Sequence, residues 1–183
     1  MEIVEKVLTD ALILKPRLFE DERGYFYESF NDKVFESLSG VRVDFIQDNQ
    51  SYSSKGTLRG LHFQKGEAAQ AKLVRVTKGS AYDVAVDLRP DSLTFKKWYG
   101  VELSEENHLQ FFIPRGFAHA FVALEDNTIF QYKVDNYYSG VNDGGVFWND
   151  EELNITWPKL KLELSEKDNN LPKLNQINLN TLW

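Results

Sequence analysis

Short runs of alternating apolar and polar residues cover most of the chain and predict β-strands. Turn-forming stretches such as TKGS, RPDS, EDN and SGVNDGG separate these runs roughly every 8–12 residues, a spacing typical of a β-sandwich or barrel. Strand-like runs do not alternate with helical ones, which argues against a parallel doubly wound sheet. The pattern therefore favours an antiparallel jelly roll or barrel. The expected strands lie within residues 10–16, 24–30, 43–53, 56–64, 72–79, 80–90, 96–104, 109–116, 118–127, 128–139 and 154–158.

Two segments break this pattern and predict short helices. Residues 31–40, NDKVFESLSG, offer Asn31 or Asp32 as an N-cap and Gly40 as a terminator. A second short helix is expected near SEKDNN, in the lysine- and asparagine-rich segment after Pro158. No internal repeat, low-complexity tract or linker divides the chain, so we expect one domain over residues 1–183.

Composition narrows the classes of function. The 183 residues are 42% apolar and 14% aromatic, which suits one domain with a β-rich core. The net charge of −7 argues against a general nucleic-acid binder but leaves room for a small anionic ligand held by a local cluster of cations. The absence of cysteine excludes disulfides, thiolate metal sites and cysteine nucleophiles. The N-terminal residues show no signal peptide or membrane span, and we expect a cytoplasmic protein.

The stretch GTLRGLHFQ, residues 56–64, does not read as a plain core strand. Strict alternation would place Arg59 with Leu61 on one face and Gly60 with His62 on the other, so both faces would mix apolar and polar groups. A buried cation needs an anionic or hydrogen-bonding partner. This stretch is therefore a candidate for chemistry, although a satisfied structural histidine is the alternative for His62.

The three histidines do not have the spacing of a metal site. Such a site usually needs two close histidines and a carboxylate, and Gln64 stands where a His-x-His pair would have its second imidazole. His108 follows two glutamates in an expected turn and is interpreted as a surface residue. We therefore expect no metal at His62 or His119.

Two other strands add polar groups to apolar rows. Lys72 shares a face with Val74 and Val76, and Tyr132 shares one with Phe130 and Val134. An arginine, a lysine and a histidine converging inside a barrel would suit a negative ligand or a developing oxyanion.

Five motifs in order, DERGYFYESF, QDNQSYS, LRGLHFQ, PRGFAHAF and LSEKD, resemble the dTDP-4-dehydrorhamnose 3,5-epimerase family. The resemblance runs from about Ile3 to Pro172. It implies an all-β, cupin-type jelly roll (double-stranded β-helix) with a few short helices. It also implies a homodimer, contacted by the N-terminal strands, that works without metal or organic cofactor. The expected reaction inverts C3 and C5 of dTDP-4-dehydro-6-deoxy-D-glucose, in dTDP-L-rhamnose biosynthesis.

The resemblance also assigns catalytic roles. It makes His62 the general base, Asp168 its orienting partner, Tyr132 the acid on the opposite face, and Lys72 with Arg59 the cations near the C4 oxygen. Spacing alone would favour a solvated helix-start aspartate at position 168. A base, an acid and a nearby cation are what proton transfer beside a ketone needs, because the enolate carries its charge on the C4 oxygen.

Binding roles are implied in the same way. Asp143 stands where the family usually has glutamate, so its contact is expected to be shorter or to pass through water. Phe26 and Tyr138 are expected to stack on thymine, with Phe26 supplied by this chain or by the other subunit; ordinary half-buried aromatics are the alternative. The remaining expected ligand contacts are Arg23, Glu28, Gln47, Asn49, Arg59, His119 and Lys167.

Three other functions remain open from the sequence: a single-position epimerase or 3,4-ketoisomerase on the same nucleotide sugar, a metal-dependent cupin oxygenase, and a non-catalytic sugar-binding cupin. Tyr132 favours the double epimerase, because protonation at C5 from the far face needs an acid.

The resemblance sends Arg59 and His62 to one pocket, which strict alternation forbids. One extra residue between them would bring both to the same face, and glycine tolerates the geometry of such an insertion. We therefore predict a β-bulge or a local break in strand geometry at or near Gly60.

Overall fold

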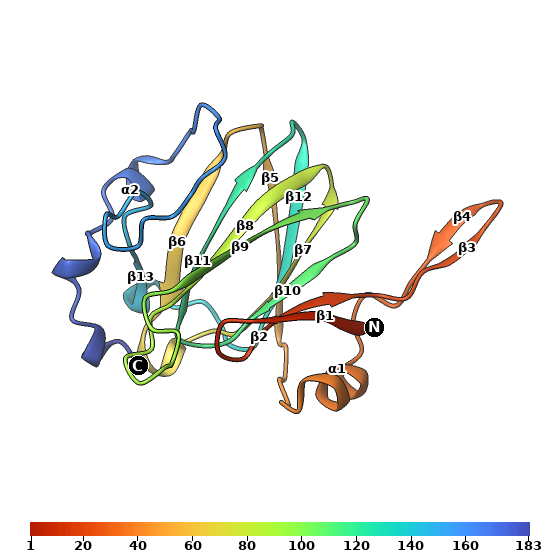
Figure 1. Ribbon diagram of the computed structural model, residues 1–183, viewed down its shortest axis with the longest axis horizontal. Coiled ribbons are helices and arrows are strands. Elements are labelled where there is room, and N and C mark those ends of the chain that lie inside the picture. The colour runs from red at the N-terminus through yellow and green to blue at the C-terminus, as the bar shows by residue number, and fades with distance from the viewer.

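Two antiparallel β-sheets lie face to face in the computed structural model, which describes residues 1–183 (Figure 1). The strands are β1 (Glu2–Val7), β2 (Ala11–Lys15), β3 (Phe19–Asp21), β4 (Gly24–Phe26), β5 (Gln47–Ser53), β6 (Leu58–Gln64), β7 (Lys72–Lys78), β8 (Ser80–Asp87), β9 (Trp98–Ser104), β10 (Gln110–Ile113), β11 (Phe117–Ala123), β12 (Thr128–Val134) and β13 (Asp143–Gly145). One sheet has six strands in the order β1-β2-β10-β7-β12-β5, and the other has five in the order β13-β6-β11-β8-β9. The expected antiparallel all-β fold is confirmed.

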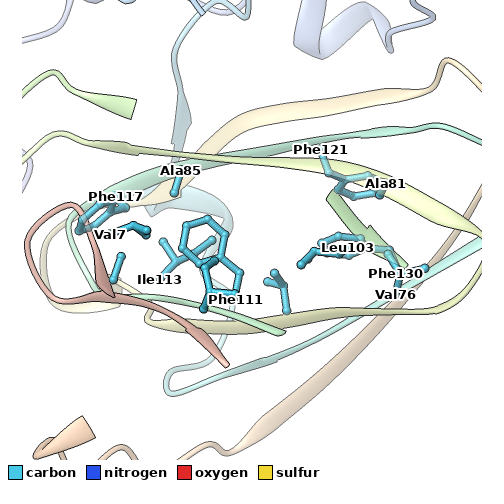
Figure 2. Packing of buried hydrophobic residues seen from close by; sticks show 13 residues of the cluster. Val7, Val76, Ala81, Ala85, Leu103, Phe111, Ile113, Phe117, Phe121 and Phe130 are labelled. Carbon is cyan, nitrogen blue, oxygen red and sulfur yellow. The ribbon is translucent and has the colours of Figure 1, made fainter. Parts of the chain in front are cut away.

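The apolar positions that alternate along the strands meet between the two sheets. Figure 2 shows this cluster, in which Phe111, Phe121 and Phe130 are buried. Phe121 of β11 and Phe130 of β12 stack across the gap with ring centroids 4.0 Å apart. Burying one side chain of this size contributes about 1.5–3 kcal/mol, so this cluster holds the sheets together.

The two expected helices are present as α1 (Asp32–Ser39) and α2 (Glu166–Asn169). Asn31 caps α1 by accepting a hydrogen bond from the Val34 N–H, and Gly40 ends it in the left-handed conformation, with φ of +73°. The helix buries Phe35 against Phe112 on the outer face of the six-stranded sheet. Short 3₁₀ turns occupy Gly66–Ala68, Gly140–Asn142, Leu174–Gln176 and Leu179–Thr181. None of the helices has the length and apolar character needed to cross a bilayer.

The C-terminal part of the chain covers the outer face of the five-stranded sheet (Figure 1). Ile155 and Leu174 pack there against residues such as Leu61 of β6. This packing explains one wrong expectation, because residues 154–158 form no strand. Ile155 and Trp157 alternate with polar residues as in a strand, but they belong to a loop that packs these two apolar side chains on the sheet.

Three strands were not predicted from the sequence. β1 lies at the edge of its sheet, and its charged, largely exposed residues hide the alternation. β3 and β13 have only three residues each, and β13 lies in a glycine-rich stretch that reads as a turn.

A hairpin formed by β3 and β4 projects from the body of the molecule (Figure 1). Phe26 on this hairpin, which we call the arm (residues 19–26), is 70% exposed, and Phe19 and Tyr25 are exposed as well. Exposed aromatic side chains grouped in this way mark a surface that binds a partner or a ligand.

Candidate active site

The predicted bulge is present in β6. His62 lies opposite His119 of β11, and Arg59 lies opposite Phe121, so three steps along β6 match two steps along β11. Because His119 and Phe121 share the inner face of β11, Arg59 and His62 both face the space between the sheets. Gly60, with φ of +125°, supplies the inserted residue, and its peptide bond to Leu61 is cis. The prediction for GTLRGLHFQ is confirmed.

His62 forms a close pair with a carboxylate from the C-terminal segment. Its Nε2 lies 2.6 Å from Oδ1 of Asp168, on α2. Burial opposes ionisation of Asp168, but the hydrogen bond and charge of His62, the Ser165 hydroxyl and the Gly60 amide together lower its pKa. The His62 side chain is 31% exposed and that of Asp168 is 6% exposed. A ligand can therefore reach the imidazole while its partner stays shielded from water.

A second histidine–carboxylate pair lies beside the first. His119 Nε2 is 2.8 Å from Oδ2 of Asp83, on β8, and both residues are buried. Burial raises the pKa of Asp83 against the opposing effects of His119 and Lys72, and it lowers the pKa of His119. The other Asp83 oxygen, Oδ1, is buried without a hydrogen-bond partner in the chain.

Lys72 and Tyr132 face the same space from β7 and β12. Lys72 Nζ lies 5.8 Å from the centroid of the Tyr132 ring. Burial lowers the pKa of Lys72 to about 8, against the opposing charges of Asp83 and Asp143. Burial also raises the pKa of Tyr132, although the Arg59 charge opposes this shift. Near neutral pH the site therefore holds an ammonium group that loses its proton more readily than usual, and a protonated phenol.

One edge of the site is a chain of polar contacts around β13. Asp143 lies opposite Gln64 of β6 and accepts a hydrogen bond of 3.0 Å from its Nε2. The other Asp143 oxygen forms an ion pair with Lys167, the residue before Asp168. The backbone N–H of Ser139 donates to Gln64 Oε1 at 2.8 Å. These contacts join the loop after β12 to the helix that carries Asp168.

The remaining expected contacts divide into two groups. Gln47 and Asn49 lie on β5 opposite Val134 and Tyr132, and their side chains are joined by a hydrogen bond of 2.9 Å. The Tyr138 ring is exposed at the loop after β12. This chain therefore brings together His62, Lys72, Tyr132, Asp168, Arg59, His119, Gln47, Asn49, Asp143 and Lys167, with Tyr138 at the rim.

Three expected residues lie elsewhere in this chain. Arg23 and Phe26 are on the projecting arm, and Glu28 follows it (Figure 1). Arg23 is held by Asp21, with 2.5 Å between Nη2 and Oδ2, and Glu28 accepts a hydrogen bond from Asn31. His108, expected at the surface, is partly buried at the base of the arm.

His108 lies there between two aromatic rings. Its ring centroid is 4.9 Å from that of Tyr25 and 5.4 Å from that of Tyr27.

Asp83 and Gln64 belong to the site but were not predicted from the sequence. Asp83 is a lone carboxylate in SAYDVAVDL, an otherwise apolar strand, and that isolation could have identified it. Gln64 was considered only as the residue that replaces a metal ligand. No group of three or more histidine, aspartate or glutamate side chains is arranged to hold a metal ion.

The arrangement suits proton transfer next to a carbonyl group. An accessible imidazole with a shielded carboxylate can accept a proton, and a neutral phenol can donate one. A partly desolvated ammonium group near the phenol can stabilise an oxyanion.

Comparison with known proteins gives one consistent result. Residues 5–176 match the family described as dTDP-4-dehydrorhamnose 3,5-epimerase. The enzyme of that name from Escherichia coli K12 is 53% identical over 97% of this chain and 96% of its own length.

Solved structures agree with the sequence comparison. The epimerase from Elizabethkingia anophelis NUHP1 matches with a TM-score of 0.93 and 54% identity, covering 97% of this chain and 98% of that one. The epimerase from Legionella pneumophila Philadelphia 1, solved in complex with dTDP-4-keto-L-rhamnose, matches with a TM-score of 0.94 and 44% identity, covering 99% of this chain and 96% of that one. These matches confirm the cupin-type jelly roll. The chain therefore belongs to the dTDP-4-dehydrorhamnose 3,5-epimerase family, and its activity is that isomerisation, in dTDP-L-rhamnose biosynthesis.

Proposed function

We propose that His62 is the base that removes the protons at C3 and C5 of dTDP-4-dehydro-6-deoxy-D-glucose. The observation that carries this proposal is the pair formed by His62 Nε2 and Asp168 Oδ1 at 2.6 Å. The carboxylate fixes the orientation of the imidazole and stabilises the imidazolium that forms when His62 accepts a proton. Its lowered pKa keeps Asp168 ionised for this role at neutral pH.

Each inversion then has a balanced course. The C–H electron pair moves into a double bond to C4, and the carbonyl π electrons move to the C4 oxygen. The Lys72 ammonium group, with Arg59, stabilises this oxyanion, whose charge develops in the transition state. Tyr132 donates its phenolic proton to the opposite face of the ring carbon, and the enolate electrons return to form the new C–H bond. Proton exchange with solvent resets His62 and Tyr132 before the next inversion.

The other residues of the site hold the nucleotide sugar. His119, paired with the buried Asp83, presents a fixed imidazole beside His62. The Tyr138 ring is exposed and available to stack on thymine. Gln47, Asn49, Asp143 and Lys167 supply further hydrogen-bonding groups at the edge of the site.

The arm completes a site in a second copy of the chain. Arg23, Phe26 and Glu28 lie on or beside a hairpin that projects from the body with its aromatic side chains exposed. In a homodimer of single-domain chains, each spanning residues 1–183, the arm would carry these residues to the partner's nucleotide. Because its substrate is a nucleotide sugar and the chain has no cysteine, we place the enzyme in the cytoplasm.

The test follows both ring positions in deuterated water by NMR. The proposal expects deuterium at C3 and at C5 with formation of the L-sugar. Deuterium at C3 or C5 alone would replace it with a single-position epimerase, and migration of the ketone to C3 would indicate a 3,4-ketoisomerase. Unchanged turnover in both His62→Ala and Tyr132→Phe would contradict the assigned roles. Activity that follows stoichiometric iron or manganese and is lost to a chelator would favour the oxygenase.

The dimer has its own test. Analytical ultracentrifugation should show two copies in solution. Mixing inactive His62→Ala with inactive Phe26→Ala should restore part of the activity, because a mixed dimer contains one site with an intact base and an intact arm. A monomer, or no recovery on mixing, would contradict arm exchange.

A further inference from the structure

Gln64 has a carboxamide whose two ends bind different parts of the site. It is the last residue of β6, shares a face with His62 and is 5% exposed. Its Nε2 donates to Asp143 Oδ1 at 3.0 Å, and its Oε1 accepts from the Ser139 N–H at 2.8 Å. A carboxylate at this position would repel Asp143, and an apolar side chain would leave both partners unpaired. Only an uncharged group with a donor and an acceptor satisfies both sides.

The acceptor end of Gln64 positions the loop that carries Tyr138. Ser139 directly follows Tyr138, so the hydrogen bond to its N–H fixes the backbone next to the exposed ring. The Tyr138 N–H has only a long contact of 3.4 Å, to Gln47 Oε1. The shorter contact of Ser139 to the buried Gln64 side chain therefore does more to set the position of this ring.

The donor end positions the partner of the base. Asp143 is held between Gln64 Nε2 and the Lys167 ammonium group. Lys167 lies on α2 next to Asp168, whose carboxylate is held by His62, the Ser165 hydroxyl and the Gly60 amide and whose backbone N–H donates to Ser165 Oγ at 3.1 Å. Because α2 has only four residues, its own hydrogen bonds cannot hold it firmly, and it depends on such tertiary contacts.

We propose that Gln64 is a positioning residue that aligns the nucleotide end of the site, through Tyr138, with the proton-transfer end, through Asp143, Lys167 and Asp168. This inference rests on the proposed function, in which Tyr138 stacks on thymine and Asp168 supports the base. The Gln64 side chain is hydrogen-bonded to neither His62 nor the Tyr138 ring, so its effects must pass through Ser139, Asp143 and Lys167.

The first test is a double-mutant cycle on dTDP binding, measured by isothermal titration calorimetry, which needs no chemistry. Gln64→Leu should weaken dTDP binding about tenfold, the equivalent of about 1.4 kcal/mol, because it removes the hydrogen bond to the Ser139 N–H that holds the Tyr138 loop and leaves that N–H unpaired. In the Tyr138→Ala background the same substitution should cost less than threefold, because the ring that it positions is absent. Equal losses in both backgrounds would overturn the inference.

The second test separates the two ends of the carboxamide. Gln64→Glu keeps the shape and the acceptor for Ser139 but puts a carboxylate against Asp143. We expect dTDP affinity within threefold of wild type and kcat lowered about tenfold. The ratio of mutant to wild-type kcat should rise as the pH falls, because a proton on the introduced carboxyl restores the donor. A pH-independent ratio, or a loss confined to dTDP affinity, would overturn the inference.

Gln131→Leu is the matched control. Gln131, on the outer face of β12, also has two side-chain hydrogen bonds, to Gln50 and Arg75. This variant should leave dTDP affinity and kcat within twofold of wild type, and a loss equal to that of Gln64→Leu would overturn the inference. If Gln64→Leu does not fold, the isosteric Gln64→Glu carries the test. Failure of the wild-type protein to bind dTDP would overturn the proposed function and this inference together, whereas normal binding with additive effects would overturn the inference alone.

Discussion

Gly60→Ala tests the bulge on which the site depends. An added Cβ would lie 2.5 Å from the Ala120 Cβ and 2.5 Å from the His119 carbonyl oxygen. Both belong to β11, which is paired on both edges, so neither can move away at low cost. The φ of +125° lies in a region that side chains other than glycine rarely adopt.

The loss of stability expected for Gly60→Ala has two contributions, the strained backbone and the close contacts of the added Cβ. Backbone strain of this kind costs roughly 1–3 kcal/mol, and overpacking a tight site costs about 1–3 kcal/mol more. Together they amount to about 2–6 kcal/mol, a large part of a typical free energy of unfolding of roughly 5–15 kcal/mol. If β6 relaxes by losing the bulge, Arg59 turns away from the pocket and Asp168 loses the Gly60 amide. Any folded fraction should therefore lose at least about tenfold in kcat, the equivalent of about 1.4 kcal/mol.

The assay is urea unfolding followed by tryptophan fluorescence at fixed protein concentration, together with turnover of the folded enzyme. Gly40→Ala is the control, because Gly40 also has positive φ, +73°, but no atom lies within 4 Å of the added Cβ. It should cost only about 1 kcal/mol and leave turnover unchanged. Typical substitutions change the free energy of unfolding by about 1 kcal/mol. If Gly60→Ala changed it by less than about 0.5 kcal/mol and left turnover normal, the reasoning would be refuted.

Three further predictions concern the titrating groups. Because the pKa of Lys72 is lowered to about 8, kcat should fall as the pH rises through that value. Asp83→Asn should move this alkaline fall in kcat to lower pH, because it removes an anion that favours the ammonium form of Lys72. An alkaline fall that does not move would show that Asp83 does not act on Lys72. Tyr132→Phe should lower the rate of the C5 inversion by about 10²–10⁴, read as product formation by NMR, while His62 still exchanges the C3 proton; loss of C3 exchange as well would give Tyr132 a different role. The lowered pKa of Asp168 contributes stability that is present above about pH 3.8 and is lost as the pH falls through the folded-state pKa. Asp168→Asn should therefore weaken the fall in the free energy of unfolding at acidic pH. An unchanged fall would contradict the pairing of Asp168 with His62.

The fold was largely predictable because short strand-like runs separated by turn residues indicate an antiparallel β-protein. Alternation over residues 128–134 reflects a strand with one buried face, and the caps of α1 depend on Asn31 and Gly40 alone. Residues 154–158 resemble a strand in sequence but form a loop, because a loop that packs on a sheet can bury alternate side chains as a strand does. The edge strand β1 was missed for the opposite reason, since exposure on both faces removes the alternation.

The site was predictable in part, and the limit was distance along the chain. Arg59, Gly60 and His62 are neighbours, so their mixed polarity pointed to a bulge without any tertiary information. Asp168 is separated from His62 by 106 positions, and spacing alone favoured a solvated aspartate there. Only family resemblance linked the two. The role of Gln64 could not be predicted from the sequence, because its hydrogen-bond partners come close to it only when β13 pairs with β6.

The buried ammonium group of Lys72 serves catalysis but lowers the stability of the folded protein. A lysine whose pKa falls from 10.5 to about 8 on folding makes the folded state less stable below that pH, by about 3 kcal/mol at roughly 1.4 kcal/mol per unit. The folded state recovers this free energy only as the pH rises from about 8 towards 10.5. A library screened for survival on heating alone should therefore enrich apolar residues at position 72, and the most durable enzymes it yields should be among the least active.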